Sequence, residues 1–475
     1  MLAVGAVALP DRLAWAVGLD DPHIGGIGFS GPTTGDLAAV YWNPAAVGLM
    51  HGLNLTFAGT STQTTTTVAR APVAGLPSFN DTRASDFSQP FIWPPGPGSF
   101  AGVSYDVGGD RFTLAFATYM PFVDRSTYQA TPGQALATRY HRVSTDLRNL
   151  ALVPALSVRF LGDFRLGVAP GVLFSTGRLS FAESTCLSSA GCVEDPAADA
   201  NLDLGSDQGI FSAKVGVTLA AGIYFRRRAW EFGFSFSSRP LGEVDGSAVI
   251  SGDRSGITKP GGQPLTCQNG NPDGRNCVFA DIVYKLPYTI SGAVAWHPRP
   301  GWETAAIVRV LSFPANDVID IRLTGTTLAD ASVPARISLY RGYGTVVDTR
   351  LRLSTWINQH LRAGVTLRFE SSALPGRAVS PAAVDGRKVE PAAMIVLQVV
   401  RHVWIGAGYA FTYMFPVTAN PSDFAPDAAA RCTAAGESLT EPACITRRNG
   451  LARPTAAGTY HRIGHALSLS MTAQF

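Results

Sequence analysis

WEFGFSFS, residues 230–237, places an aromatic ring at every second position and a small or acidic residue between the rings. Successive side chains of a strand point to opposite faces, so this pattern predicts a strand with one apolar and one polar face. The same alternation runs through residues 361–369, 403–415 and 463–475. One or two such segments would fit a soluble sandwich, but we count fourteen along the chain, which favours an all-β transmembrane barrel.

The connections between these segments alternate between short and long. Short turns are predicted at 108–110, 162–163, 226–228, 298–301, 358–360 and around Arg401. Long, turn-rich segments are predicted at 61–97, 121–145, 183–207, 238–286, 312–345, 371–388 and 416–459. Thirteen connections imply a 14-stranded antiparallel barrel, and an even strand number places both chain ends on the short-turn side.

The composition excludes several other classes of protein. Charged residues make up 15% of the 475 residues, and no window of about 20 apolar residues lacks a charge, which excludes a helical membrane protein. The 38 basic residues are scattered among 35 acidic ones, so no clustered basic face points to nucleic acid.

The amino terminus and the cysteines point to secretion. Residues 1–16 contain an apolar run and end in Ala14-Trp15-Ala16, which predicts a signal peptide, although no basic residue precedes the run. The six cysteines form three close pairs in turn-rich segments, and we expect three local disulfides rather than a zinc site, because no CxxC spacing or neighbouring histidine is present. The expected disulfides join Cys186 with Cys192, Cys267 with Cys277, and Cys432 with Cys444.

Residues 17–52 do not alternate. Residues 25–31 contain a GxGxxG pattern, but neither a strand before it nor a βαβ unit around it supports a dinucleotide site. A short helix is predicted from near Asp36 to Asn43, because Pro44 disfavours a helical residue before it. Asn43 and Pro44 therefore have a simple alternative role as a helix cap.

Residues 25–49, with Tyr41-Trp42-Asn43-Pro44-Ala45 at their centre, resemble the amino-terminal segment of the FadL/TodX-type outer-membrane transporters of long-chain fatty acids and hydrocarbons. Residues 285–298, 361–387 and 458–461 also resemble that family. The resemblance implies a fourteen-stranded barrel (53–475) whose lumen is plugged by a small helical hatch (17–52). It further implies passive outer-membrane transport of long-chain fatty acids or related apolar compounds, with Asn43 and Pro44 in gating. The alternative prediction is a channel for the uptake of aromatic hydrocarbons.

A ligand with a carboxylate would need a cation on the polar face of a strand. Lys214, Arg362 and Arg368 occupy such faces, and Arg368 is our preferred anchor, although pairing with lumen acids such as Glu370 is the simpler reading for each. Phe91 and Trp93 belong to an apolar group in the first long segment, with Phe79, Phe87 and Ile92. This group could form an outer landing site for apolar ligands or pack its own loop.

Two other classes of function are less well supported by the sequence. An outer-membrane lipase would need a serine and a histidine at the outer rim, but no such arrangement can be read from spacing, and His461 and His465 lie some 13 Å apart on a strand. An adhesive barrel would bind a partner through its loops, yet it has no use for a luminal plug. We therefore expect a monomeric non-enzyme without cofactor or metal, whose partners are a hydrophobic small molecule and outer-membrane lipid.

Overall fold

The computed structural model describes residues 23–71, 82–87, 99–107, 111–129, 136–184, 199–205, 215–251, 279–314, 317–324, 335–424 and 453–475. The predicted signal peptide, Lys214, Phe91 and Trp93 lie outside these residues, as does the turn predicted at 108–110.

The three expected disulfides also fall outside the described residues, so they stay predictions. This holds for both members of each pair, namely Cys186 and Cys192, Cys267 and Cys277, and Cys432 and Cys444.

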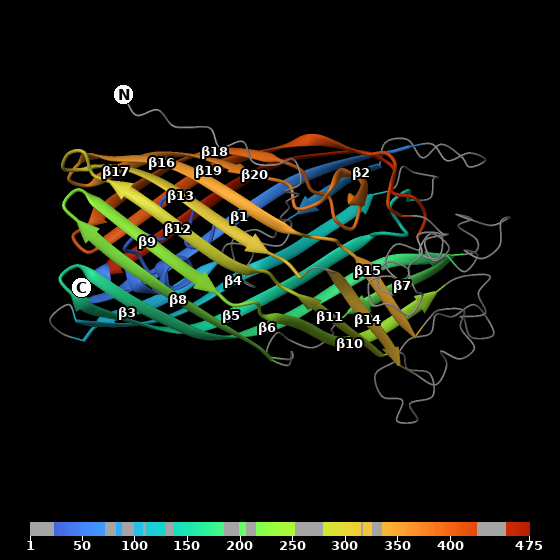
Figure 1. The fold of residues 1–475 in the computed structure, drawn as a ribbon, viewed down its shortest axis with the longest axis horizontal. Helices are drawn as coiled ribbons and strands as arrows, with labels where there is room; N and C mark the ends of the chain where they lie inside the picture. The colour runs from blue at the N-terminus through green and yellow to red at the C-terminus, as the bar shows by residue number, and fades with distance from the viewer. Residues whose placement is uncertain are drawn as a thin grey trace, which may run out of the picture.

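One antiparallel sheet closes on itself to form the barrel (Figure 1). Its strands are β1 (Leu53–Arg70), β2 (Thr82–Phe87), β3 (Phe100–Asp106), β4 (Phe112–Gln129), β5 (Ser144–Leu161), β6 (Phe164–Ser184), β7 (Asp199–Gly205), β8 (Val215–Arg227), β9 (Trp230–Ser237), β10 (Leu241–Ser251), β11 (Phe279–Lys285), β12 (Tyr288–Trp296), β13 (Trp302–Ser312), β14 (Val318–Thr324), β15 (Arg336–Tyr340), β16 (Thr345–Asn358), β17 (Leu361–Glu370), β18 (Lys388–Val400), β19 (Val403–Ala419) and β20 (Gly458–Gln474). Closure comes from β1, which pairs with β20 from Asn54↔Gln474 to Arg70↔Gly458.

The ring has fourteen strand positions, as the sequence predicted. Six of these positions are each occupied by two consecutive strands. The two strands pair with the same neighbouring positions, one further along the barrel than the other. These shared positions are β2 with β3, β7 with β8, β9 with β10, β11 with β12, β13 with β14, and β15 with β16.

The five described short turns lie where they were predicted, and they gather at the end of the barrel near the carboxyl terminus (Figure 1). The long segments were partly misread. Strands β2, β7, β10, β11, β14 and β15 lie within segments expected to be loops, and β20 begins at Gly458, before the alternating run predicted at 463–475. These strand portions were missed because they are short and separated from the longer alternating runs.

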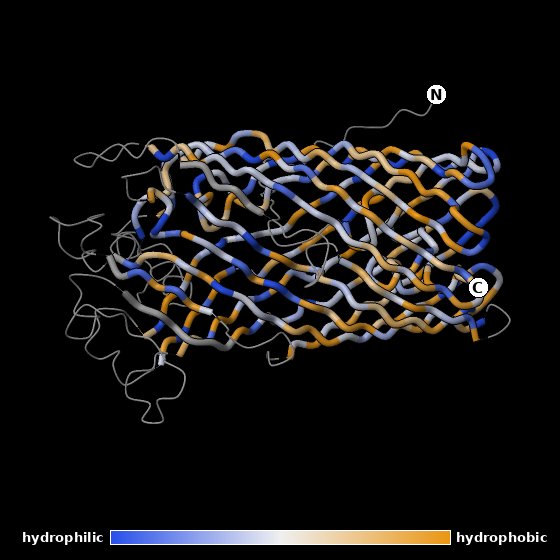
Figure 2. Tube along the Cα trace, turned by 180° about the vertical axis from the view of Figure 1, so that it is seen from behind, coloured by the Kyte–Doolittle hydropathy of each residue, from blue (hydrophilic) through white to orange (hydrophobic). Residues whose placement is uncertain are grey.

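The two faces of the wall differ as the alternation predicts. Phe232, Phe234 and Phe236 of β9 point outward and are 42%, 51% and 41% exposed, whereas Glu231 and Ser235 between them are buried inside. Apolar residues are most frequent in the half of the barrel nearest the carboxyl terminus (Figure 2). The outer surface of that half therefore suits a lipid environment.

Aromatic rings gather close to the short turns. Trp230 stacks on Trp296 with ring centroids 5.8 Å apart, and Trp356 meets Trp404 at 5.6 Å. Such belts of tryptophan mark the level of a membrane–water interface. No helix among the described residues is long and apolar enough to cross a membrane.

Candidate functional site

The described part of the hatch, residues 23–52, lies buried inside the barrel. It contains the helix α1 (Ala39–Trp42) and the 3-10 helix η1 (Pro44–Leu49). The helix begins three residues later than predicted, because Asp36 instead accepts a hydrogen bond from the backbone of Ala39 (3.1 Å) at the start of the first turn. It ends at Asn43, as predicted, and Pro44 takes the first position of η1, where a missing N–H costs nothing.

Asn43 does more than cap a helix. Its Oδ1 accepts a hydrogen bond from the backbone of Ala45 (3.1 Å), which is the capping bond. Its Nδ2 donates to the carbonyls of Pro32 in the hatch (2.7 Å) and Ile223 on β8 (3.0 Å). Because the side chain is fully buried, these bonds tie two parts of the hatch to the wall.

Three wall glycines let the hatch come this close. A Cβ at Gly222 would lie 1.9 Å from Oδ1 of Asn43, one at Gly233 would lie 2.2 Å from the carbonyl oxygen of Pro32, and one at Gly167 would lie 2.2 Å from the nitrogen of Ala45. No side chain larger than hydrogen fits at such distances, so the backbone of the hatch packs directly on β6, β8 and β9.

Serines beside these glycines add hydrogen bonds to the hatch. Ser157 on β5 donates to the carbonyl of Ala45 (2.8 Å), and Ser235 on β9 donates to that of Trp42 (2.5 Å). The register places Ser157 opposite Gly167 and Ser235 opposite Gly222. One cross-strand row of small residues therefore forms the docking surface.

Charged side chains hold the opposite side of the hatch. The ring of Trp42 contacts two arginines of adjacent strands. The guanidinium carbon of Arg309 on β13 lies 5.0 Å from the ring centroid, and that of Arg350 on β16 lies 4.8 Å from it. Nε2 of His23 lies 3.3 Å from Oε1 of Glu390 on β18. The hatch is thus held by close backbone packing on one wall and by electrostatic contacts on the other.

A small cavity remains between the hatch and the wall. It measures about 40 Å³, and its lining includes Tyr41 and Trp42 of the hatch, Tyr119 and Phe122 of β4, and Arg309. The rest of the lining is mainly small or apolar. This cavity is the luminal pocket.

Among the residues that the structure describes, the strand pairing of the wall is interrupted next to this pocket. Strand β3 pairs with β1 only as far as Ala58↔Phe100, and β2 resumes the pairing at Gln63↔Phe87. Among the described residues, β1 from 59 to 62 has no partner on this side, and neither does β4 from 120 to 126. Pro121 falls in this stretch of β4, where a residue without an N–H loses no ladder bond.

An apolar cavity of about 460 Å³ lies at the interruption. Its lining includes Phe57 of β1, Phe100 of β3, Met120 of β4, and Leu469 and Met471 of β20. Phe57, Leu469 and Met471 are about half exposed on the outer face of the barrel. We call this cavity the lateral pocket, because its lining includes both the buried Phe100 and exposed residues of the outer apolar surface.

Tyr119 belongs to the linings of both pockets. Its ring meets Tyr41 of the hatch edge-on, with centroids 5.3 Å apart, and stacks on Phe100 at 6.3 Å. An aromatic row therefore runs from the hatch to the gap in the described strand pairing, and Tyr119 borders both pockets.

The two described arginines that we proposed as ligand anchors face the interior, as expected, but both are engaged. Arg368 lies against Asp348 (3.0 Å), Glu370 and Glu390 (3.5 Å). Arg362 pairs with Glu303 (2.9 Å) and covers the ring of Phe29. Each arginine is thus matched by carboxylates of the wall.

Sequence reasoning missed Tyr119, Phe100, the wall glycines and the pairing of Arg309 and Arg350 with Trp42. Alternation assigns each of these residues to a face, but their contacts depend on which strands become neighbours. Only the clustering of glycines and serines at inward positions of residues 222–235 could have indicated a docking surface.

The fold and the site define a closed β-barrel with a plugged lumen and an apolar cavity at its wall. The sequence matches no family model and no curated protein. Among solved structures, the chain is similar to a FadL homologue of Pseudomonas aeruginosa (14% identity, 97% of this chain and 100% of that chain covered, TM-score 0.69). It is also similar to the toluene transporters TodX of Pseudomonas putida (13%, 97% and 100%, 0.62) and TbuX of Ralstonia pickettii (11%, 98% and 99%, 0.59). This chain therefore has the fold of the FadL/TodX-type transporters, as its hatch motif predicted.

Proposed function

We propose that this protein is an outer-membrane channel for the passive transport of hydrophobic molecules such as long-chain fatty acids or related apolar compounds. The observation that carries the proposal is the lateral pocket, an apolar cavity at the gap in the described strand pairing, whose lining shares Tyr119 with the luminal pocket. An apolar molecule gains roughly 25 cal/mol for each Å² of its surface removed from water. An apolar path through the protein is therefore more favourable for such a molecule than a water-filled pore.

In this proposal the ligand enters from the long-loop side, reaches the luminal pocket and leaves through the lateral pocket into the membrane. The hatch blocks the direct route to the short-turn side, and Asn43 with Pro44 fixes its seated position. One chain closes the ring through β1 and β20, which supports action as a monomer.

Two features support a location in the outer membrane. The outward faces of the strands are apolar, and tryptophan pairs mark the short-turn boundary. The solved structures with this fold include transporters and channels for toluene and monoaromatic hydrocarbons, which supports a transporter rather than an enzyme.

The pairing of the interior arginines favours uncharged ligands, including aromatic hydrocarbons, as a second candidate class. A fatty-acid carboxylate at Arg368 would have to compete with Asp348, Glu370 and Glu390 for the same guanidinium. Arg362 and Arg368 remain proposed ligand contacts, and so do Lys214, Phe91 and Trp93.

The test is uptake of radiolabelled oleate and radiolabelled toluene by cells that lack their own channels of this kind. Ala101 lines the lateral pocket, so we expect Ala101→Trp to reduce saturable uptake several-fold. Val294 points outward on β12, which is adjacent to neither β1 nor β4, and Val294→Trp should leave uptake unchanged. If the folded protein gives no more uptake of either ligand than cells without it, the proposal is wrong.

A further inference from the structure

The segment between β17 and β18, residues 371–387, folds across the long-loop end of the barrel instead of extending from it. Val379, Ala383 and Asp385 are at most 1% exposed. Tyr128 at the far end of β4 donates a hydrogen bond to the carbonyl of Pro381 (3.0 Å), and Arg142 donates to that of Ala382 (2.6 Å). Because β19, β20, β1 and the position shared by β2 and β3 separate β18 from β4, this segment spans the opening. We call it the crossing loop.

A continuous series of ion pairs, completed by the polar contact of His23 with Glu390, leads from the crossing loop to the hatch. Nζ of Lys388 lies 2.5 Å from Oδ1 of Asp385 in the crossing loop and 2.7 Å from Oε1 of Glu370. Glu370 also pairs with Arg368, whose Nη1 lies 3.5 Å from Oε2 of Glu390. Oε1 of Glu390 in turn lies 3.3 Å from Nε2 of His23 in the hatch. We call these six residues the ion-pair chain.

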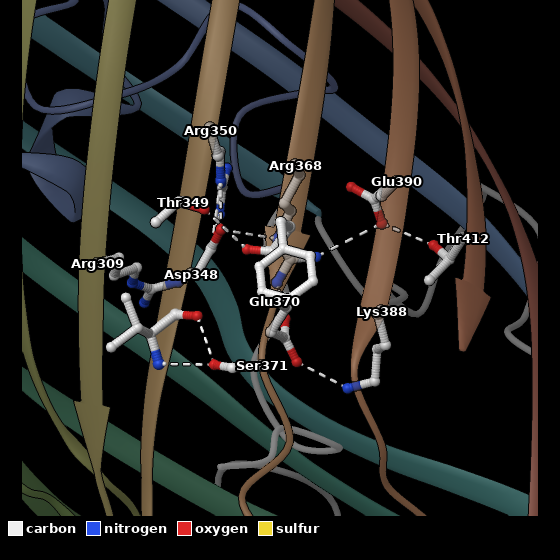
Figure 3. A network of polar contacts seen from close by, with 12 residues as sticks. Arg309, Asp348, Thr349, Arg350, Arg368, Glu370, Ser371, Lys388, Glu390 and Thr412 are labelled. Carbon is white, nitrogen blue, oxygen red and sulfur yellow. Dashed lines mark hydrogen bonds and ion pairs between the residues drawn. The ribbon is translucent and has the colours of Figure 1, made fainter. Parts of the chain in front are cut away.

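Three adjacent strands bring the wall members of this chain together. Glu370 and Arg368 of β17 lie directly opposite Lys388 and Glu390 of β18, and Asp348 of β16 lies opposite Glu370. Figure 3 shows these side chains pointing toward one another, with Thr412 of β19 bonded to Glu390 at 2.7 Å. Lys388, Arg368, Glu370 and Glu390 are all at least nine-tenths buried. A buried charge that loses its partner is costly, so these groups must redistribute together.

Each inner member of the chain has one partner on either side within the chain, and Arg368 and Glu390 are held in addition by Asp348 and Thr412. This sharing gives the coupling a sign. If Asp385 withdraws, Lys388 turns fully to Glu370, and Glu370 then attracts Arg368 less. Arg368 then interacts more strongly with Glu390. As a result, Glu390 binds His23 less strongly. The same sequence runs in reverse when His23 leaves, and it ends in a weaker contact between Lys388 and Asp385.

We propose that the crossing loop is a second gate, and that the ion-pair chain couples it to the hatch so that release of either one favours release of the other. An apolar ligand that displaces the crossing loop would thereby loosen the hatch before reaching it. The coupling free energy between two sites is reciprocal, so it acts in both directions.

The proposal can be tested without a ligand by hydrogen exchange on the full chain in detergent or lipid. The reporter in the hatch is the amide of Ile27, which donates to Oγ of Ser468 on β20 (3.0 Å) and exchanges when the hatch leaves the wall. At pH 8, Asp385→Asn should speed exchange of this amide about fivefold or more, the lower end of typical coupling between sites. In turn, His23→Gln should speed exchange in the crossing loop.

The matched control is Arg377→Gln. Arg377 lies in the same loop, and its partner Asp423 is outside the ion-pair chain, so the hatch should be unaffected. In a chain that already carries Glu370→Gln, Asp385→Asn should have no further effect on Ile27. Folding of every variant is checked by heat-resistant migration on gels. The comparison of Asp385→Asn with Arg377→Gln stands even if Glu370→Gln fails to fold.

Two results would overturn the proposal. One is exchange of Ile27 within twofold of the unmodified protein in Asp385→Asn. The other is an equal acceleration by Arg377→Gln, which would show a general effect of charge in the loop rather than transmission through the ion-pair chain.

Discussion

The ring of Tyr119 on β4 lies edge-on against the ring of Tyr41 in the hatch, with centroids 5.3 Å apart. Edge-to-face pairs of this kind contribute about 0.5–1.5 kcal/mol beyond simple burial. Since Tyr119 also lines both pockets, movement of the hatch and opening of the passage between the pockets involve the same side chain.

We expect Tyr119 to limit the passage of ligand between the two pockets. Tyr119→Ala should raise the initial rate of toluene uptake several-fold, because it joins the luminal and lateral pockets, whereas Tyr119→Trp should lower it. Removing a buried aromatic side chain costs about 3–5 kcal/mol of stability, so the amount of folded protein in the membrane must be measured for each variant. A fall in uptake per folded molecule with Tyr119→Ala would instead identify the ring as a binding contact.

Gly222→Ala should loosen the hatch. The new Cβ would meet Oδ1 of Asn43 at 1.9 Å, and overpacking of this kind costs about 1–3 kcal/mol. Exchange of hatch amides at residues 43–46 should therefore rise by roughly tenfold. Gly292→Ala is the matched control, because nothing lies within 4 Å of a Cβ at that position. Equal exchange in both variants would argue against close packing of the hatch on β8.

Trp42→Leu should weaken the other side of the hatch. The substitution removes the contacts of the indole with Arg309 and Arg350, and a desolvated cation–π contact contributes about 2 kcal/mol. Exchange at residues 39–50 should rise roughly tenfold or more. Trp302→Leu removes a contact with Arg299 at a short turn and should leave the hatch unchanged. If the two variants behave alike, the paired arginines do not hold the hatch.

Much of the fold could be predicted because its signals are local. The alternation at 230–237 assigns each side chain to a face, since successive residues of any strand point to opposite sides. Pro44 stops α1 because proline restricts the residue before it, and this also needs no tertiary information. The short turn at 162–163 follows from glycine, whose positive φ at Gly162 is accessible without strain.

The sequence by itself thus determined a fourteen-position barrel, its lipid face, its short turns and a hatch that ends its helix at Asn43. Only the tertiary structure decided where the wall is interrupted, that Asn43 reaches Ile223, that residues 371–387 turn inward and that Arg368 is shared by three carboxylates. The physical reason is register: the residues that meet in each of these contacts are set by how strands slide against one another and where the ring closes. Neither property is encoded within any one segment.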